Sequence, residues 1–90
     1  MRIPYLEVTY RKGRVLAAYY HVVASANRRA ARTRKVAPGL VVDYGRDGEA
    51  LGVEITSPSV VTLTALNRVL RSLGLDPLKA DEFKPLRAAS

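Results

Sequence analysis

The alternation of apolar and polar residues predicts a β-hairpin in the middle of the chain. Residues 40–44 and 49–56 are rich in β-branched and other apolar residues, and the segment between them, Gly45 to Gly48, is rich in Gly and Asp. Such a pattern is typical of two antiparallel strands joined by a short turn, because Gly and Asp tolerate the backbone angles of a tight reversal. We therefore predict strands at 40–44 and 49–56, with their apolar residues on one shared surface.

The register of this hairpin follows from the expected turn. If residues 45–48 form the loop, Tyr44 lies opposite Glu49 and Val42 lies opposite Leu51. Gly52 falls inside the second strand, where a glycine indicates a bulge or a close approach of another element to the backbone.

Three further strands are expected before the hairpin. Strand-forming residues occupy 3–10 and 14–23, and the basic segment 31–36 precedes Pro38-Gly39. A helix from Ala24 to Lys35 is the alternative for this basic segment, because Ala and Arg are good helix formers. As a strand, 31–36 would carry charge on both faces, which is typical of the edge of a sheet.

The sequence of the C-terminal third predicts helices. Apolar residues recur with a helical period over 63–73, Thr62 can cap the N-terminus and Gly74 can end the helix. A short turn of helix is expected at about 80–84, because Pro85 prevents a longer one. The predicted fold is α+β: one domain over residues 1–90, with a small antiparallel β-meander of about five strands and a C-terminal helix packed on one face.

Composition narrows the class of protein. Ninety residues suffice for one core, and the apolar fraction of 48% is that of a globular protein. The chain has no cysteine, which excludes disulfides and thiolate metal sites. It has no apolar run of bilayer length and no signal-peptide pattern near Met1, so we expect a cytoplasmic protein without membrane partners.

The charge is unevenly distributed along the chain. The net charge is +7, and residues 1–37 carry nine cations and one acid, whereas residues 38–90 carry six cations and seven acids. Such asymmetry favours an anionic partner, or pairing with the acidic part of a second copy. The candidate anion or nucleic-acid contacts are Arg28, Arg29, Arg32, Arg34 and Lys35. Solvated charge on a sheet edge is the competing interpretation.

Other side chains suggest chemistry less strongly. Asp43 and Glu54 should share a face of the hairpin, and paired carboxylates can act as acid and base. His21 is the only histidine, which leaves a zinc site short of ligands, so we expect it to make an ordinary hydrogen bond. We therefore predict no catalytic residues, no metal site and no cofactor, and a protein that is not an enzyme.

Part of the sequence resembles a known family. Residues 32–44, with the turn Asp47-Gly48 and the strand Gly52-Val53-Glu54-Ile55, resemble the domain of unknown function 2283 family of small prokaryotic proteins. The resemblance covers about residues 32–86. It implies a mainly β domain with a C-terminal helix and no established activity. Some relatives lie beside toxin-like genes, which implies an antitoxin-like role. Arg11, Lys12 and Arg14 stand where that family carries acids.

These observations lead to one expected function and one alternative. The expected function is that of a non-enzymatic binding protein that forms a homodimer and is an antitoxin-like partner of another protein. The alternative is a nucleic-acid-binding protein that uses the basic segment 28–35.

Overall fold

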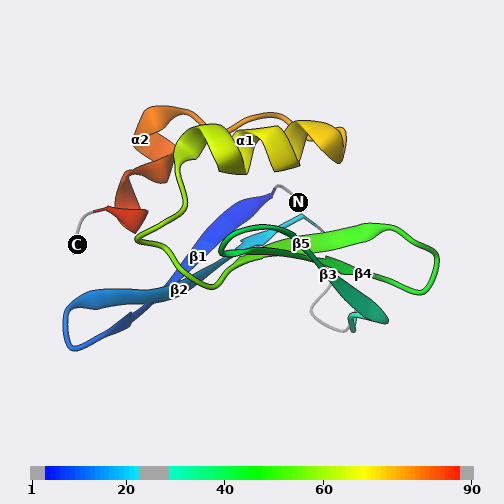
Figure 1. Cartoon of the computed structure of the whole chain (residues 1–90), viewed down its shortest axis with the longest axis horizontal. Coiled ribbons are helices and arrows are strands. Elements are labelled where there is room, and N and C mark those ends of the chain that lie inside the picture. The colour runs from blue at the N-terminus through cyan, green and yellow to red at the C-terminus, as the bar shows by residue number, and fades with distance from the viewer. Residues whose placement is uncertain (1–3, 23–28, 88–90) are drawn as a thin grey trace.

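The computed structural model, which describes residues 4–22 and 29–87, contains a five-stranded antiparallel sheet with its helices on one side (Figure 1). The α+β fold class is therefore as predicted. Within the described residues, no helix is long and apolar enough to cross a membrane.

The observed elements lie close to the predicted ones. The strands are β1 Tyr5–Arg11, β2 Arg14–His21, β3 Arg32–Ala37, β4 Leu40–Tyr44 and β5 Ala50–Ile55, and the helices are α1 Leu63–Ser72, α2 Ala80–Phe83 and the short 3-10 helix η1 Lys84–Leu86. Residues 3 and 23, which the sequence placed in strands, lie outside the described residues. The segment 32–37 is a strand, as favoured over the helix, while residues 24–28 of that alternative are not described.

The order of strands across the sheet is β1-β2-β5-β4-β3, which departs from a simple meander at one place. β3, β4 and β5 follow one another as antiparallel neighbours, but β2 pairs with β5, so that Ala18 lies opposite Ile55 and Tyr20 opposite Val53. The physical reason is burial. A sequential order would enclose the charged β3 between two strands, whereas the observed order places it at the edge and buries Ala18 and Tyr20 in the core.

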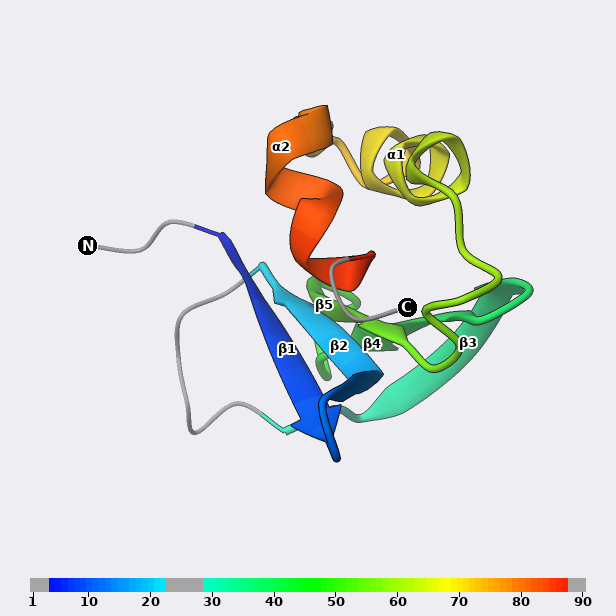
Figure 2. The ribbon, with the colours of Figure 1, turned by 90° about the vertical axis from the view of Figure 1, so that its left-hand side faces the viewer.

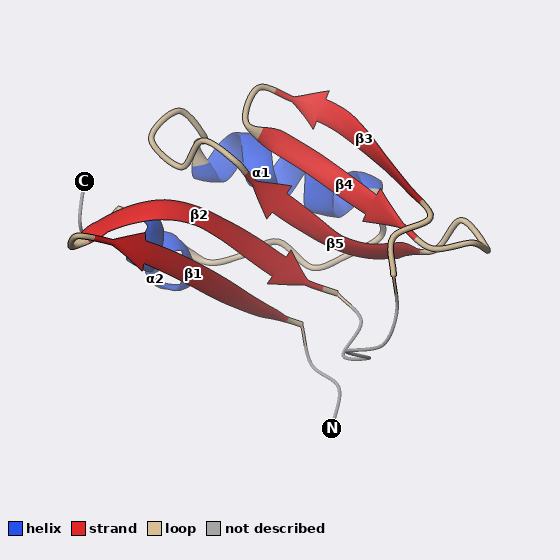
Figure 3. Ribbon diagram, turned by 90° about the horizontal axis from the view of Figure 1, so that it is seen from below, coloured by secondary structure: helices blue, strands red, loops and turns tan. Residues whose placement is uncertain are grey.

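The core lies between the sheet and the helices. The hairpin residues Leu40, Val42, Val53 and Ile55 are fully buried, as are Leu66 and Leu70 on α1. Figures 2 and 3 show α1 over β5 and β4, and α2 over β2 and β1, while no described helix lies on the other face of the sheet, called the uncovered face below. The prediction that the hairpin's apolar surface packs against this helix is confirmed.

The register of the β4–β5 hairpin differs from the predicted one. Val42 lies opposite Val53, and Tyr44 lies opposite Ala50, with an irregularity between Asp43 and Tyr44. The shift has two causes: the loop spans residues 45–49 rather than 45–48, and Leu51 is an extra residue of β5 at the irregularity. The amide of Gly45 donates to the carbonyl of Glu49, and the carboxylate of Asp47 accepts from the amide of Glu49. Gly48 supplies the positive φ of +84° that the turn requires.

Helix α1 begins after Thr62 and ends before Gly74, as the sequence predicts. The hydroxyl oxygen of Thr62 accepts a hydrogen bond from the amide of Ala65 at 3.1 Å, which is the geometry of an N-cap. The helix ends before Gly74, whose φ of +77° lets the amide of Leu75 return to the carbonyl of Leu70.

Candidate binding surfaces

The basic edge strand β3 is the most exposed element of the sheet. Every residue of β3 except Ala37 is exposed, and no other strand of the described residues pairs with its outer side. Arg29 is exposed just before the strand, while Arg28 lies outside the described residues. The structure thus places three of the five predicted contacts on this edge strand, namely Arg32, Arg34 and Lys35, and leaves Arg29 exposed three residues before it.

The cations of β3 extend to both faces of the sheet. Arg32 pairs with Tyr44 and Arg34 with Val42, so both lie on the face that the helices cover, whereas Lys35 pairs with Val41 on the uncovered face. The guanidinium carbon of Arg32 lies 5.0 Å from the centre of the Tyr44 ring, within the range of a cation–π contact. This contact holds one guanidinium at the edge.

These cations lack acidic partners within the described part of the chain. Among the described residues, no acidic side chain lies within ion-pair distance of Arg29, Arg32, Arg34 or Lys35, whereas Glu7 contacts His21 across the β1–β2 pair. Their charge is therefore available to an anionic ligand.

A second group of polar residues lies on the uncovered face of the sheet, which Figure 3 shows towards the viewer. The hydroxyl of Tyr19 donates a hydrogen bond to Oδ2 of Asp43 at 2.9 Å. To reach it, the Tyr19 ring lies directly over Gly52, where a Cβ atom would be only 2.5 Å from the ring. The predicted close approach to Gly52 is therefore confirmed, and Tyr19 is the group that makes it.

The chemistry of this group favours a structural role. Burial raises the pKa of Tyr19, and the hydrogen bond to Asp43 and the charges of Asp43 and Glu54 raise it further. The phenol therefore stays protonated near neutral pH and acts as a hydrogen-bond donor. Asp43 and Glu54 do share a face, as predicted, because Asp43 pairs with Gly52 and Glu54 with Val41. Oδ1 of Asp43 is buried and has no hydrogen-bond partner among the described residues.

His21 makes the ordinary hydrogen bond that the sequence predicted. Its Nε2 lies 2.7 Å from Oε1 of Glu7 across the β1–β2 pair. The imidazole stacks on Tyr5, with ring centres 4.4 Å apart, and meets Tyr19 edge-on at 4.6 Å. Across residues 4–22 and 29–87, no group of three or more His, Asp and Glu side chains is placed to hold a metal ion.

Sequence reasoning missed the contact between Tyr19 and Asp43. The two residues come from strands that are not adjacent, and only the pairing of β2 with β5 brings them together. The available signal was Gly52, because a glycine inside a strand marked the place where another side chain approaches the backbone.

Comparisons with protein-family models, with curated proteins and with solved structures find no match to this chain. The resemblance to the domain of unknown function 2283 family therefore remains a prediction from the residues that carry it.

Proposed function

We propose that this protein is a non-enzymatic binding protein that recognises an acidic, extended segment of another protein through the edge strand β3. The observation that carries the proposal is the combination of an unpaired strand edge with exposed, unpaired cations on both of its faces.

An unpaired edge offers a row of main-chain donors and acceptors to which an extended peptide can add as a further strand. Side chains of such an added strand alternate between the two faces of the sheet. Acidic residues on the helix-covered side would meet Arg32 and Arg34, and those on the uncovered side would meet Lys35. A protein partner of this kind fits the antitoxin-like role that the family resemblance implies.

A nucleic acid that binds through the same cations is the second candidate, favoured by the guanidinium of Arg32 on the Tyr44 ring. The acids of the uncovered face weigh against it. Glu7, Asp43 and Glu54 lie on that face and would repel a phosphate backbone laid across the sheet. A ligand confined to the strand edge avoids these carboxylates.

A direct test compares two labelled probes in fluorescence anisotropy at low salt: a short peptide that alternates Glu with Val, and a single-stranded oligonucleotide of similar length. We expect the peptide to bind. The double variant Arg34→Glu with Lys35→Glu should weaken peptide binding by about tenfold or more, because it reverses charge on both faces of β3.

The matched control is Arg46→Glu with Arg68→Glu, which makes the same change in net charge at exposed positions outside β3. It should leave peptide binding within a few-fold of the wild type. Binding of the oligonucleotide alone, with a steep dependence on salt, would favour the second candidate. Absence of binding by either probe would overturn the proposed use of β3.

A further inference from the structure

The opposite edge of the sheet, β1, differs from β3 in character. It carries one acid, Glu7, and one cation, Arg11, and its tyrosines Tyr5 and Tyr10 are 51% and 50% exposed. Leu6 and Val8 face the core but are only partly buried. β1 is thus an unpaired edge with apolar side chains left partly open.

A groove runs beside the N-terminal half of β1, between this strand and α2. Two adjoining hollows of about 330 and 370 Å³ form it, and both are bordered by Pro4, Tyr20, Leu78 and Glu82. Asp76 lines one hollow, and Leu6 and Val8 line the other. Apolar side chains and carboxylates therefore share the walls of the groove.

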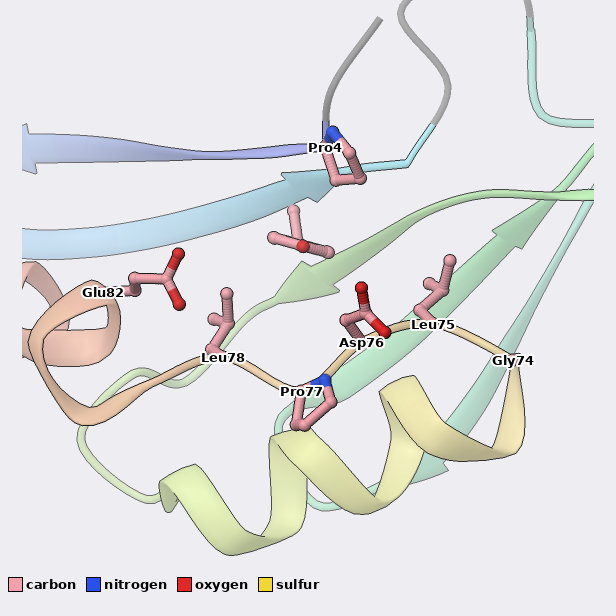
Figure 4. Close-up of a pocket in the computed structure, with 8 residues that line it drawn as sticks. Pro4, Gly74, Leu75, Asp76, Pro77, Leu78 and Glu82 are labelled. Atoms are coloured by element: carbon pink, nitrogen blue, oxygen red, sulfur yellow. The ribbon is translucent and has the colours of Figure 1, made fainter.

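The charge of this groove is negative. Figure 4 shows the carboxylates of Asp76 and Glu82 directed into the hollow. Their charges raise the pKa of Tyr20 beyond the increase that burial causes, which indicates that both act on the interior of the groove. Among the residues that the structure describes, no Lys or Arg lines either hollow. The groove therefore suits a partner that is apolar and basic.

The turn at the other end of β1 has that character. Arg11, Lys12 and Arg14 are exposed there, and the structure records no ion pair for them among the described residues. Together with Val15 and Leu16 they surround a shallow hollow of about 350 Å³, and Leu16 is 52% exposed. The basic turn and the acidic groove thus lie at opposite ends of one strand.

We propose that the protein forms a two-fold symmetric dimer in which the β1 strands of two copies pair antiparallel, so that the basic turn of each copy lies at the acidic groove of the other. The register that pairs all of β1 places Val8 against Val8 of the second copy, Leu6 against its Tyr10, and Tyr5 against its Arg11. Lys12 of the second copy then lies opposite Pro4, which borders the same hollow as Asp76.

This arrangement gives a partner to the unpaired edge of β1 and covers its partly exposed apolar side chains. Antiparallel pairing about a two-fold axis is closed, so it ends at a dimer and joins the two sheets into one. The second copy's Tyr10 would cover Leu6 and the mouth of the groove. A dimer through β3 is disfavoured, because it would bring Arg32, Arg34 and Lys35 of both copies face to face.

A charge-exchange experiment tests the proposal by sedimentation equilibrium over a dilution series. The wild type should be a concentration-dependent dimer. Asp76→Lys and Lys12→Asp should each raise the dissociation constant by about tenfold, since each places like charges together twice per dimer. The double variant should return it to within a few-fold of the wild type, because the ion pairs are restored with opposite sign.

A control variant and a hydrogen-exchange measurement test whether the effect is specific to the β1 interface. Asp81→Lys, which makes the same charge change on α2 outside the groove, should leave the dissociation constant unchanged. Hydrogen exchange should show that dimerisation protects amides of β1 and not those of β3. A wild type that is monomeric throughout the series would overturn the proposal. So would a dimer that neither single variant weakens, or a double variant that stays as weak as the singles.

Discussion

At the scale of single residues, Gly52 has the most direct consequence for the sheet. Its missing side chain leaves the space that the Tyr19 ring occupies, and this position lets the Tyr19 hydroxyl reach Asp43. Because glycine has no side chain, a hydrogen bond can form between β2 and β4, which are not neighbours in the sheet.

Gly52→Ala should destabilise the protein by about 1–3 kcal/mol, because the new methyl group forces the Tyr19 ring away from its place. Urea unfolding measures the loss. In a Tyr19→Ala background the same substitution should cost much less, since the obstructing ring is gone. Equal costs in both backgrounds would show that Tyr19 does not set the requirement for glycine.

At the scale of elements, one buried side chain joins α1 to the segment that leads into α2. The Asn67 amide nitrogen donates to the carbonyl of Leu78 at 3.0 Å, and its oxygen accepts from the Leu78 amide at 2.8 Å. Asn67 is the buried polar residue of the described core, and its two bonds satisfy buried main-chain groups of Leu78. They fix where α2 lies, and hence one wall of the acidic groove.

Asn67→Ala should lower the free energy of unfolding by roughly 2–4 kcal/mol, because it leaves both main-chain groups of Leu78 buried and unpaired. Thermal or urea unfolding followed by circular dichroism measures this. Arg68→Ala, on the exposed side of the same helix, serves as the control and should change stability little. A comparable loss in both variants would contradict the role given to the Asn67 bonds.

At the scale of the whole molecule, the two faces of the sheet differ in what covers them, and its two edges differ in composition. Helices and core cover one face, polar and aromatic pairs occupy the other, and the edges β3 and β1 differ in charge. The two proposals use different edges, so one molecule can dimerise through β1 and still present β3 to another partner.

Tyrosines on both faces of the sheet make the stability of the protein depend on pH. Tyr19 on the uncovered face and Tyr20 on the covered face both have a raised pKa, chiefly because of burial. A group whose pKa is higher in the folded state contributes stability below its unfolded pKa, about 10 for tyrosine, and this contribution is lost as the pH rises above that value.

We therefore expect the free energy of unfolding, measured in urea, to decrease as the pH rises above about 10. Tyr19→Phe removes one of the two groups and should make this decrease shallower, whatever it does to stability at pH 7. A decrease of unchanged steepness in Tyr19→Phe would contradict the assignment of a raised pKa to that residue.

The sequence by itself determined most elements of this protein, since their signals depend on neighbours along the chain, and it left only the basic segment open between strand and helix. Thr62 and Gly74 limit α1, Gly48 turns the hairpin, and the apolar period identifies the surface that packs against Leu66 and Leu70. The exposed position of the basic strand also followed from its composition, because charge on both faces is tolerated at an edge.

Only the tertiary structure decided which strand lies beside which. The pairing of β2 with β5 and the contact of Tyr19 with Asp43 join residues far apart in the chain. Such contacts form in the strand arrangement that buries the most apolar surface and keeps the cations of β3 in water. The amount of buried surface is a property of the assembled sheet, so no local segment of the sequence specifies it.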